Sequence, residues 1–145
     1  MRIGRFRADG ADRIGSFDGE EILDVTPAFD SFTDALSRPD AAAGDAGDRF
    51  DPGEVTYLPP TTDRNSVFCA ALNYRKHAEE SGRSVPDRPY LFQKLPRSLV
   101  GHGDPISYHS TETDEIDYEG ELACVVGQSC RHVSADDALE YVAGY

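Results

Sequence analysis

Residues 117–126 read DYEGELACVV, and this stretch decides which fold the sequence predicts. Glu119 and Glu121 are separated by one glycine, and the apolar run LACVV follows them directly. A short apolar run with β-branched residues is typical of a strand. Side chains two residues apart on a strand point to the same face, so the two carboxylates would be neighbours. Because the run has apolar residues on both faces, we expect a strand that is buried on both sides.

Two interpretations of the glutamate pair remain open from the residues alone. Hard dications such as Mg²⁺, Mn²⁺ and Ca²⁺ prefer carboxylate oxygens, and a cation between Glu119 and Glu121 would remove their repulsion. Alternatively, the pair lies on a solvated strand face, where most glutamates are found. The buried strand expected after the pair favours a partner for the two charges.

Upstream, the stretch NYRKHAEESG predicts a helix that Asn73 can cap and Gly82 can end. His77 and Glu80 would then lie on one face of the helix, three residues apart. They could form an imidazole–carboxylate pair that moves a proton, or belong to an exposed charged cluster.

Two further apolar stretches predict strands, a short buried one, SVFCAAL, at 66–72 and another, YLFQKL, at 90–95. Lys94 stands in the second stretch and is one of only two lysines in the chain. It could bind a substrate carboxylate as a compact cation, or it could protect an exposed sheet edge. A turn and another strand are expected around GHGDPISY. A helix is expected over SADDALEYVAGY, with Ser134 and Asp137 in capping-box spacing at its start and Gly144 as its C-cap.

The first 60 residues have a different pattern and predict a small, β-rich unit. MRIGRF, RIGSF and GEEILDV are short strand candidates separated by Asp-Gly turn signals, and residues 28–37 predict a short helix. The prolines of TYLPPTTD mark a junction at residues 59–64.

The composition excludes several classes of partner. The net charge is −13, so the surface repels nucleic acid and anionic membranes. The longest dense apolar run, LACVV, is far shorter than the roughly 20 residues needed to span a bilayer, and MRIGRFRADG lacks the apolar segment of a signal peptide. Three cysteines without a CxxC pattern predict reduced thiols, and hence a cytoplasmic protein.

The charged residues have a marked bias, because all the basic residues except Lys76 and Lys94 are arginine and aspartate outnumbers glutamate. This composition predicts a halophilic protein, in which salt screens the self-repulsion of the acidic surface. Codon bias in a GC-rich genome is the alternative.

Taken together, the segments resemble a known family. NYRKHAEESG, PYLFQKLPRSLVGHGDPI and DYEGELACVVG occur in this order and at this spacing in the fumarylacetoacetate hydrolase family, and VSADDALEYVAGY follows as it does there. No single motif is specific, but the ordered set is. The resemblance covers residues 64–145, and the preceding segment is similar to the family's small leader domain.

The resemblance implies an α+β fold: a small N-terminal β-rich domain at 1–60, then the first half of a mixed β-roll at 61–145. It implies Mg²⁺ or Mn²⁺, with Ca²⁺ as a further possibility, and a homodimer. Family members hydrolyse, decarboxylate, tautomerise or hydrate oxo acids with a 1,3-dioxo or enol unit. Acylpyruvates and hydroxymuconate-type dioates from aromatic catabolism are examples.

The family also implies a role for each candidate residue. Glu119 and Glu121 match its metal ligands, while His77 and Glu80 match its catalytic dyad on a helix that closes as a lid. Lys94 matches a substrate-binding lysine of the F-x-K-P strand, although here Leu95 stands before the proline.

The family's third metal ligand is an aspartate in a strand beyond the AGY segment, and the sequence stops at Tyr145. Two expectations follow and remain open. The chain is either part of a metal-dependent hydrolase or isomerase, or a truncated remnant that no longer catalyses.

Overall fold

The structure is a computed structural model that describes residues 1–44, 47–61, 64–109, 111 and 113–145. It contains two compact units, one made of residues 1–60 and 101–145 and the other of residues 61–100. The predicted domain boundary between residues 60 and 61 stays a prediction. Within the described ranges, no helix is long and apolar enough to cross a membrane.

A β-hairpin begins the first unit. Strands β1 (Arg2–Ala8) and β2 (Ala11–Phe17) pair antiparallel along their whole length, from Arg2 opposite Phe17 to Ala8 opposite Ala11. Asp9 and Gly10 form the two-residue loop with φ angles of 52° and 76°. Two positive φ angles match the right-handed twist of the strands, and Asp-Gly adopts them readily. The hairpin predicted from the sequence is therefore confirmed.

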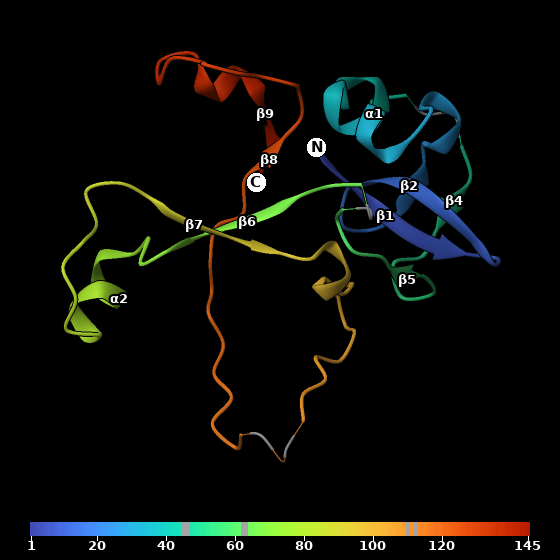
Figure 1. Ribbon diagram of the computed structural model, residues 1–145. Coiled ribbons are helices and arrows are strands. Elements are labelled where there is room, and N and C mark those ends of the chain that lie inside the picture. The colour runs from blue at the N-terminus through green and yellow to red at the C-terminus, as the bar shows by residue number, and fades with distance from the viewer. Residues whose placement is uncertain (45–46, 62–63, 110, 112) are drawn as a thin grey trace. The chain divides into compact units, whose positions relative to one another are not determined.

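Three short strands complete a sheet of order β4-β3-β2-β1-β5, in which all neighbours are antiparallel. They are β3 (Ile22–Asp24), β4 (Arg49–Phe50) and β5 (Thr56–Tyr57). Figure 1 labels β1, β2, β4 and β5 of this sheet. Helix α1 (Phe32–Ser37) lies between two 3₁₀ helices, η1 (Thr26–Ala28) and η2 (Pro39–Ala42).

The core of this unit lies between the sheet and the helical segment. Side chains from both layers form one apolar cluster, made of Ile14, Leu23, Val25, Phe29, Phe32, Ala35 and Ala42. The alternation of the strands and the apolar face of α1 thus bury the same set of side chains. Phe6 and Ile22 are also fully buried, but on the other face of the sheet, where the Phe6 ring meets the Phe17 and Phe50 rings.

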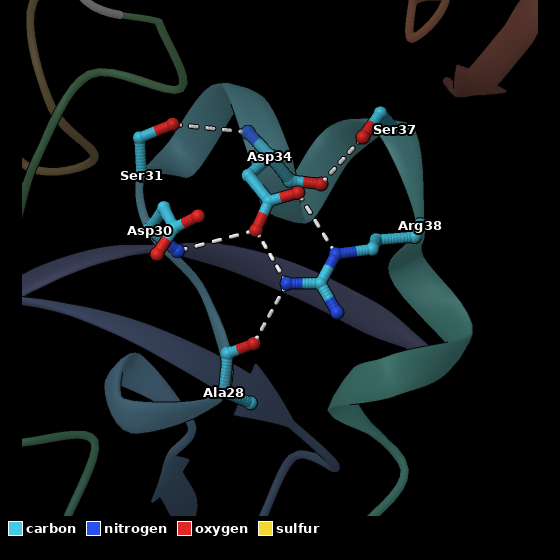
Figure 2. A network of polar contacts seen from close by, with 6 residues as sticks. All are labelled: Ala28, Asp30, Ser31, Asp34, Ser37 and Arg38. Carbon is cyan, nitrogen blue, oxygen red and sulfur yellow. Dashed lines mark hydrogen bonds and ion pairs between the residues drawn. The ribbon is translucent and has the colours of Figure 1, made fainter.

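A polar network fixes the start of α1 (Figure 2). The Ser31 hydroxyl accepts a hydrogen bond from the Asp34 N–H at 3.1 Å, so Ser31 caps the helix. The Asp34 carboxylate accepts hydrogen bonds from Arg38 Nε at 2.8 Å and from the Asp30 N–H at 3.1 Å. Arg38 also donates to the Ala28 carbonyl at 2.9 Å. The hydrogen bonds from Arg38 and Asp30 lower the pKa of Asp34 to about 2.

One charged side chain is buried in the same unit. Asp24 is 5% exposed, and its carboxylate pairs with Arg13 Nη1 at 2.5 Å. Its other oxygen accepts a hydrogen bond from the Thr26 N–H at 2.9 Å. Burial by itself would raise the pKa of Asp24, but hydrogen bonds from Thr26 and Arg13 outweigh it, so the pKa is lowered. The buried charge is therefore compensated.

The unit of residues 61–100 contains one antiparallel strand pair, β6 (Val67–Ala71) and β7 (Tyr90–Lys94), with helix α2 (Arg75–Glu80) between them. A 3₁₀ helix, η3 (Pro96–Ser98), follows. Both predicted strands form, but the burial expected of the first is wrong. Phe68 is 61% exposed and Tyr90 68% exposed, because two strands alone bury little of either face.

Residues 117–126, DYEGELACVV, differ from the prediction of a buried strand. Only β8 (Val125–Val126) is a strand, paired with β9 (Val142–Gly144), and residues 113–124 contain neither helix nor strand. Tyr118 is 90% exposed and Leu122 72% exposed. The strand buried on both sides is thus a wrong prediction, because a strand needs neighbours to pair with and cover it.

Two more expectations for the C-terminal segment are wrong. Residues 105–109, directly after the turn at 101–104, form no strand. The Ser134 and Asp137 side chains do meet at 2.7 Å, but only a 3₁₀ helix, η4 (Ala138–Tyr141), follows. Gly144 lies in strand β9 and caps no helix. The apolar residues at the end of this segment are used in strand pairing instead.

Candidate functional site

Helix α2 carries the predicted catalytic pair and ends as the sequence predicts. Gly82 has a φ of 65°, and its N–H donates to the Glu79 carbonyl at 3.0 Å. The Arg83 N–H donates to the Ala78 carbonyl at 2.8 Å. These two bonds form the glycine-terminated helix end in which the last carbonyls are satisfied. The start differs from the prediction, because Tyr74 and not Asn73 occupies the N-cap position.

His77 and Glu80 are both exposed and lie three residues apart on α2. Side chains at this spacing are neighbours on a helix surface. The helix that would present them together therefore exists. Their action as a proton-transferring dyad stays a prediction.

Lys94 is the last residue of β7 and lies opposite Val67 on β6. Its side chain is exposed, and Nζ is 5.6 Å from the centre of the Phe92 ring. A cation at this distance from an aromatic face is weakly attracted to it. The ammonium group therefore remains accessible to an anionic ligand, which keeps both interpretations of Lys94 open.

Glu119 and Glu121 are exposed and lie in the segment without helix or strand. Their carboxylates are of the donor type that Mg²⁺ and Mn²⁺ prefer. Among the residues that the structure describes, however, no three His, Cys, Asp or Glu side chains gather where they could hold a metal ion. The glutamate pair thus fits a dication in chemistry but would supply only part of its coordination shell.

The predicted residues are divided between the two units. His77, Glu80 and Lys94 belong to residues 61–100, whereas Glu119 and Glu121 belong to the other unit. Each unit therefore presents its own part of the predicted site.

A cavity of about 480 Å³ near α2 was not foreseen from the sequence. Leu72, Tyr90 and the loop of residues 83–87 line it. Leu72 has a φ of 53°, a conformation that is unusual for a leucine. The loop RSVPDRP carried only a turn signal in the sequence, because prolines mark a loop without saying what it encloses.

Comparison with known proteins decides the family. Residues 66–145 match the family described as "Fumarylacetoacetate (FAA) hydrolase C-terminal". The chain belongs to this family. The match covers more than half of the chain and includes all five candidate residues, which confirms the resemblance seen in the ordered motifs.

Curated relatives of this family member share its sequence over part of their length. The oxaloacetate tautomerase YisK of Bacillus subtilis is 40% identical over an alignment that covers 61% of this chain and 30% of the relative. The fumarylacetoacetate hydrolase domain-containing protein 2 homolog of Dictyostelium discoideum is 35% identical over an alignment that covers 92% of this chain and 47% of the relative.

The solved fumarylacetoacetate hydrolase of Exiguobacterium antarcticum has the same fold, with a TM-score of 0.72 and 33% identity. The likeness covers 97% of this chain and 52% of that structure. The chain therefore spans about half the length of its full-length relatives. The predicted fold class, the first half of a fumarylacetoacetate hydrolase fold, is confirmed.

Proposed function

We propose that the chain is part of a metal-dependent enzyme that tautomerises a 2-oxo dicarboxylic acid, with oxaloacetate as the substrate to test first. One observation carries the proposal: the family match at 66–145 includes every candidate residue. The choice of oxaloacetate rests on relatives that are named oxaloacetate tautomerases. A cytoplasmic homodimer with Mg²⁺ or Mn²⁺ is part of the same proposal.

The proposed chemistry is a proton transfer between carbon and oxygen. His77 takes the proton from carbon 3 of oxaloacetate, and a proton is returned to the oxygen on carbon 2, which gives the enol without loss of atoms. Glu80 lies three residues further along α2 and orients the imidazole. Lys94 pairs with a substrate carboxylate as a compact cation. When bound at Glu119 and Glu121, the dication would stabilise the negative charge of the enolate.

A second candidate is hydrolysis of a carbon–carbon bond in an acylpyruvate or a hydroxymuconate-type dioate from aromatic catabolism. The structural similarity to a protein named fumarylacetoacetate hydrolase favours it. The two reactions share the proton-transferring pair and differ in whether water attacks the distal carbonyl.

Enol absorbance in the presence of Mg²⁺ or Mn²⁺ tests the proposal with two proteins. One is the 145-residue chain, and the other is that chain extended with the unmatched part of the Exiguobacterium antarcticum structure. We expect tautomerisation by the extended protein and none above the metal-catalysed background by the 145-residue chain. A misplacement of about 1 Å costs on the order of 100-fold in rate, and two carboxylates hold a metal loosely.

Two substitutions in the extended protein sharpen the test. His77→Ala should lower kcat by about 100-fold or more, as expected for the loss of a general base. Lys76→Ala changes the preceding residue on the same exposed helix and should leave kcat unchanged. Equal activity of the His77→Ala protein would contradict the proposed base, and cleavage of acylpyruvates without tautomerisation would favour the second candidate.

Calorimetric titration with Mg²⁺ and Mn²⁺ tests the metal ligands separately from catalysis. We expect weak binding by the 145-residue chain and weaker binding after Glu119→Gln or Glu121→Gln. Glu115→Gln is a matched control, because Glu115 is an exposed glutamate in the same segment. Unchanged binding by the Glu119→Gln/Glu121→Gln double variant would remove these residues from the proposal.

A further inference from the structure

A cavity of about 340 Å³ lies in the unit formed by residues 1–60 and 101–145. Arg2, Phe17, Gly19, Glu21, Tyr57 and His102 contribute to its lining. None of them belongs to the candidate site described above. The volume is at the lower end of the range for ligand pockets, about 300–1,000 Å³, so it suits a molecule with a single ring.

The walls of this cavity are aromatic. The Phe17 and Tyr57 rings are stacked with their centres 6.0 Å apart, and the His102 ring meets Tyr57 edge-on at 5.4 Å. These rings come from the end of β2, from β5 and from the turn after residue 100. Stacked and edge-on arrangements are the two favourable geometries for aromatic contacts, so a further planar ring can pack against these faces.

Arg2 supplies a positive charge that is not used elsewhere in the described residues. It lies directly opposite Phe17 in the β1–β2 register. All the other arginines of residues 1–60 form ion pairs with carboxylates; they are Arg5, Arg7, Arg13, Arg38 and Arg49. Arg2 forms no such ion pair within the described residues. Its guanidinium can therefore bind an external carboxylate with two hydrogen bonds.

The backbone of Gly19 leaves room for this guanidinium. Gly19 has a φ of 110°, and a Cβ atom there would lie 3.0 Å from Arg2 Nη2. Both the conformation and the close approach favour glycine. Glu21, the carboxylate in the lining, is already paired with Arg49 and so does not take the Arg2 charge.

We propose that this cavity binds a small aromatic carboxylate. The carboxylate pairs with the Arg2 guanidinium, and the ring lies against Phe17, Tyr57 and His102. Aromatic walls without the free charge would favour a neutral ring, and the charge without the walls would favour any small anion. The combination selects an aromatic acid.

Titration of the ¹⁵N-labelled chain with benzoate, followed by amide chemical shifts, tests this inference. We expect saturable shifts at Arg2, Gly19, Tyr57 and His102. Benzamide has the same shape without the charge, and cyclohexanecarboxylate has the charge without the aromatic ring. Both should bind several-fold more weakly than benzoate, because each lacks one of the two contacts.

The variant Arg2→Gln should weaken benzoate binding about tenfold or more and leave benzamide binding unchanged. Arg7→Gln is the matched control, because Arg7 is exposed on the same strand and pairs with Asp12. It should bind benzoate like the parent chain. Preserved shift dispersion in β1–β3 shows that each variant is folded.

Three results would overturn the proposal. They are the absence of saturable shifts at these residues up to about 10 mM benzoate, equal binding of benzoate by the Arg2→Gln variant, and equal binding of cyclohexanecarboxylate and benzoate. The last result would mean that the cavity recognises charge alone. The measurements need no catalytic activity, so they stand or fall independently of the proposed tautomerase.

Discussion

The sheet of residues 1–60 and the strand pair β6–β7 use the same kinds of side chain with opposite results. Ile14 and Phe32 are each 6% exposed in the cluster between the sheet and the helical segment, whereas Phe68 is 61% exposed and Phe92 46% exposed. The first sheet has five strands and is covered by a helical segment, and the second has two strands. Apolar residues therefore become a core only where a second layer covers them.

The difference in burial reflects how much of its own fold each region contains. Residues 1–60 contain both layers of their own core. Residues 66–145 match a family domain, yet the chain covers only 52% of a solved relative. Several large apolar side chains outside the first sheet are consequently exposed, among them Leu91, Ile106, Tyr118 and Leu122.

The largest difference should appear in amide hydrogen exchange. We expect amides in the middle of β1 and β2 to exchange about 1,000-fold or more slowly than those of residues 113–124, because the strands open only by unfolding the sheet. Mass spectrometry of peptides from the two segments measures this ratio. Equal protection would mean that residues 113–124 are paired in solution and that the contrast between the regions is wrong.

Truncation of one phenylalanine in each region tests the packing directly. Phe6→Ala should lower the free energy of unfolding by about 3–5 kcal/mol, through lost burial and the cavity that is left. Phe68→Ala should change it by no more than about 0.5 kcal/mol, because the side chain is already exposed. Urea unfolding followed by circular dichroism measures both. A large loss in both variants would show that β6–β7 is buried in solution.

Acid should weaken the first region through α1. Because the pKa of Asp34 is lowered to about 2 in the folded chain, its contribution is complete above the unfolded pKa and is lost as the pH falls from about 4 to 2. Thermal unfolding across this range should show a smaller loss of stability in Asp34→Asn than in the parent. Asp40→Asn, at an exposed aspartate close by, is the control. The same acid dependence in Asp34→Asn and the parent would argue against the Arg38 network.

Salt should have the smallest effect and act on the whole chain. With a net charge of −13, self-repulsion opposes compaction, and KCl screens it. We expect the free energy of unfolding to rise by about 1 kcal/mol between low and molar KCl. Thermal melts along a KCl series test this. Equal stability throughout would favour codon bias as the reason for the acidic composition.

Features with a local cause could be predicted from the sequence. The Asp9–Gly10 turn and the glycine end of α2 each depend on a few neighbouring residues. The absence of a strand at 117–124 could not be predicted, because an apolar run becomes a strand only when another strand pairs with it. The pattern shows a capacity for burial and does not show that the burial takes place.

The candidate site also has features that the sequence predicts and features that it does not. Spacing and resemblance name His77, Glu80, Lys94, Glu119 and Glu121, but spacing alone places only the first two on one element. The cavity beside Arg2 could not be foreseen, since its lining comes from four separate segments of the chain. That Arg2 lacks an ion pair with the described residues could be recognised only from the structure, which shows the carboxylate partners of the other arginines of residues 1–60.

The β1–β2 hairpin has a kinetic consequence. Its seven residue pairs, from Arg2–Phe17 to Ala8–Ala11, close around a two-residue loop, so they join positions that are close in sequence. Little chain entropy is lost in making such contacts, and isolated hairpins form in about 1–10 μs. We therefore expect this hairpin to form first as the chain folds. It would then be the template on which β3, then β4 and finally β5 are added. Strand β5 comes last because Tyr57 pairs with the distant Phe6, whereas Arg49 of β4 pairs with the nearer Leu23.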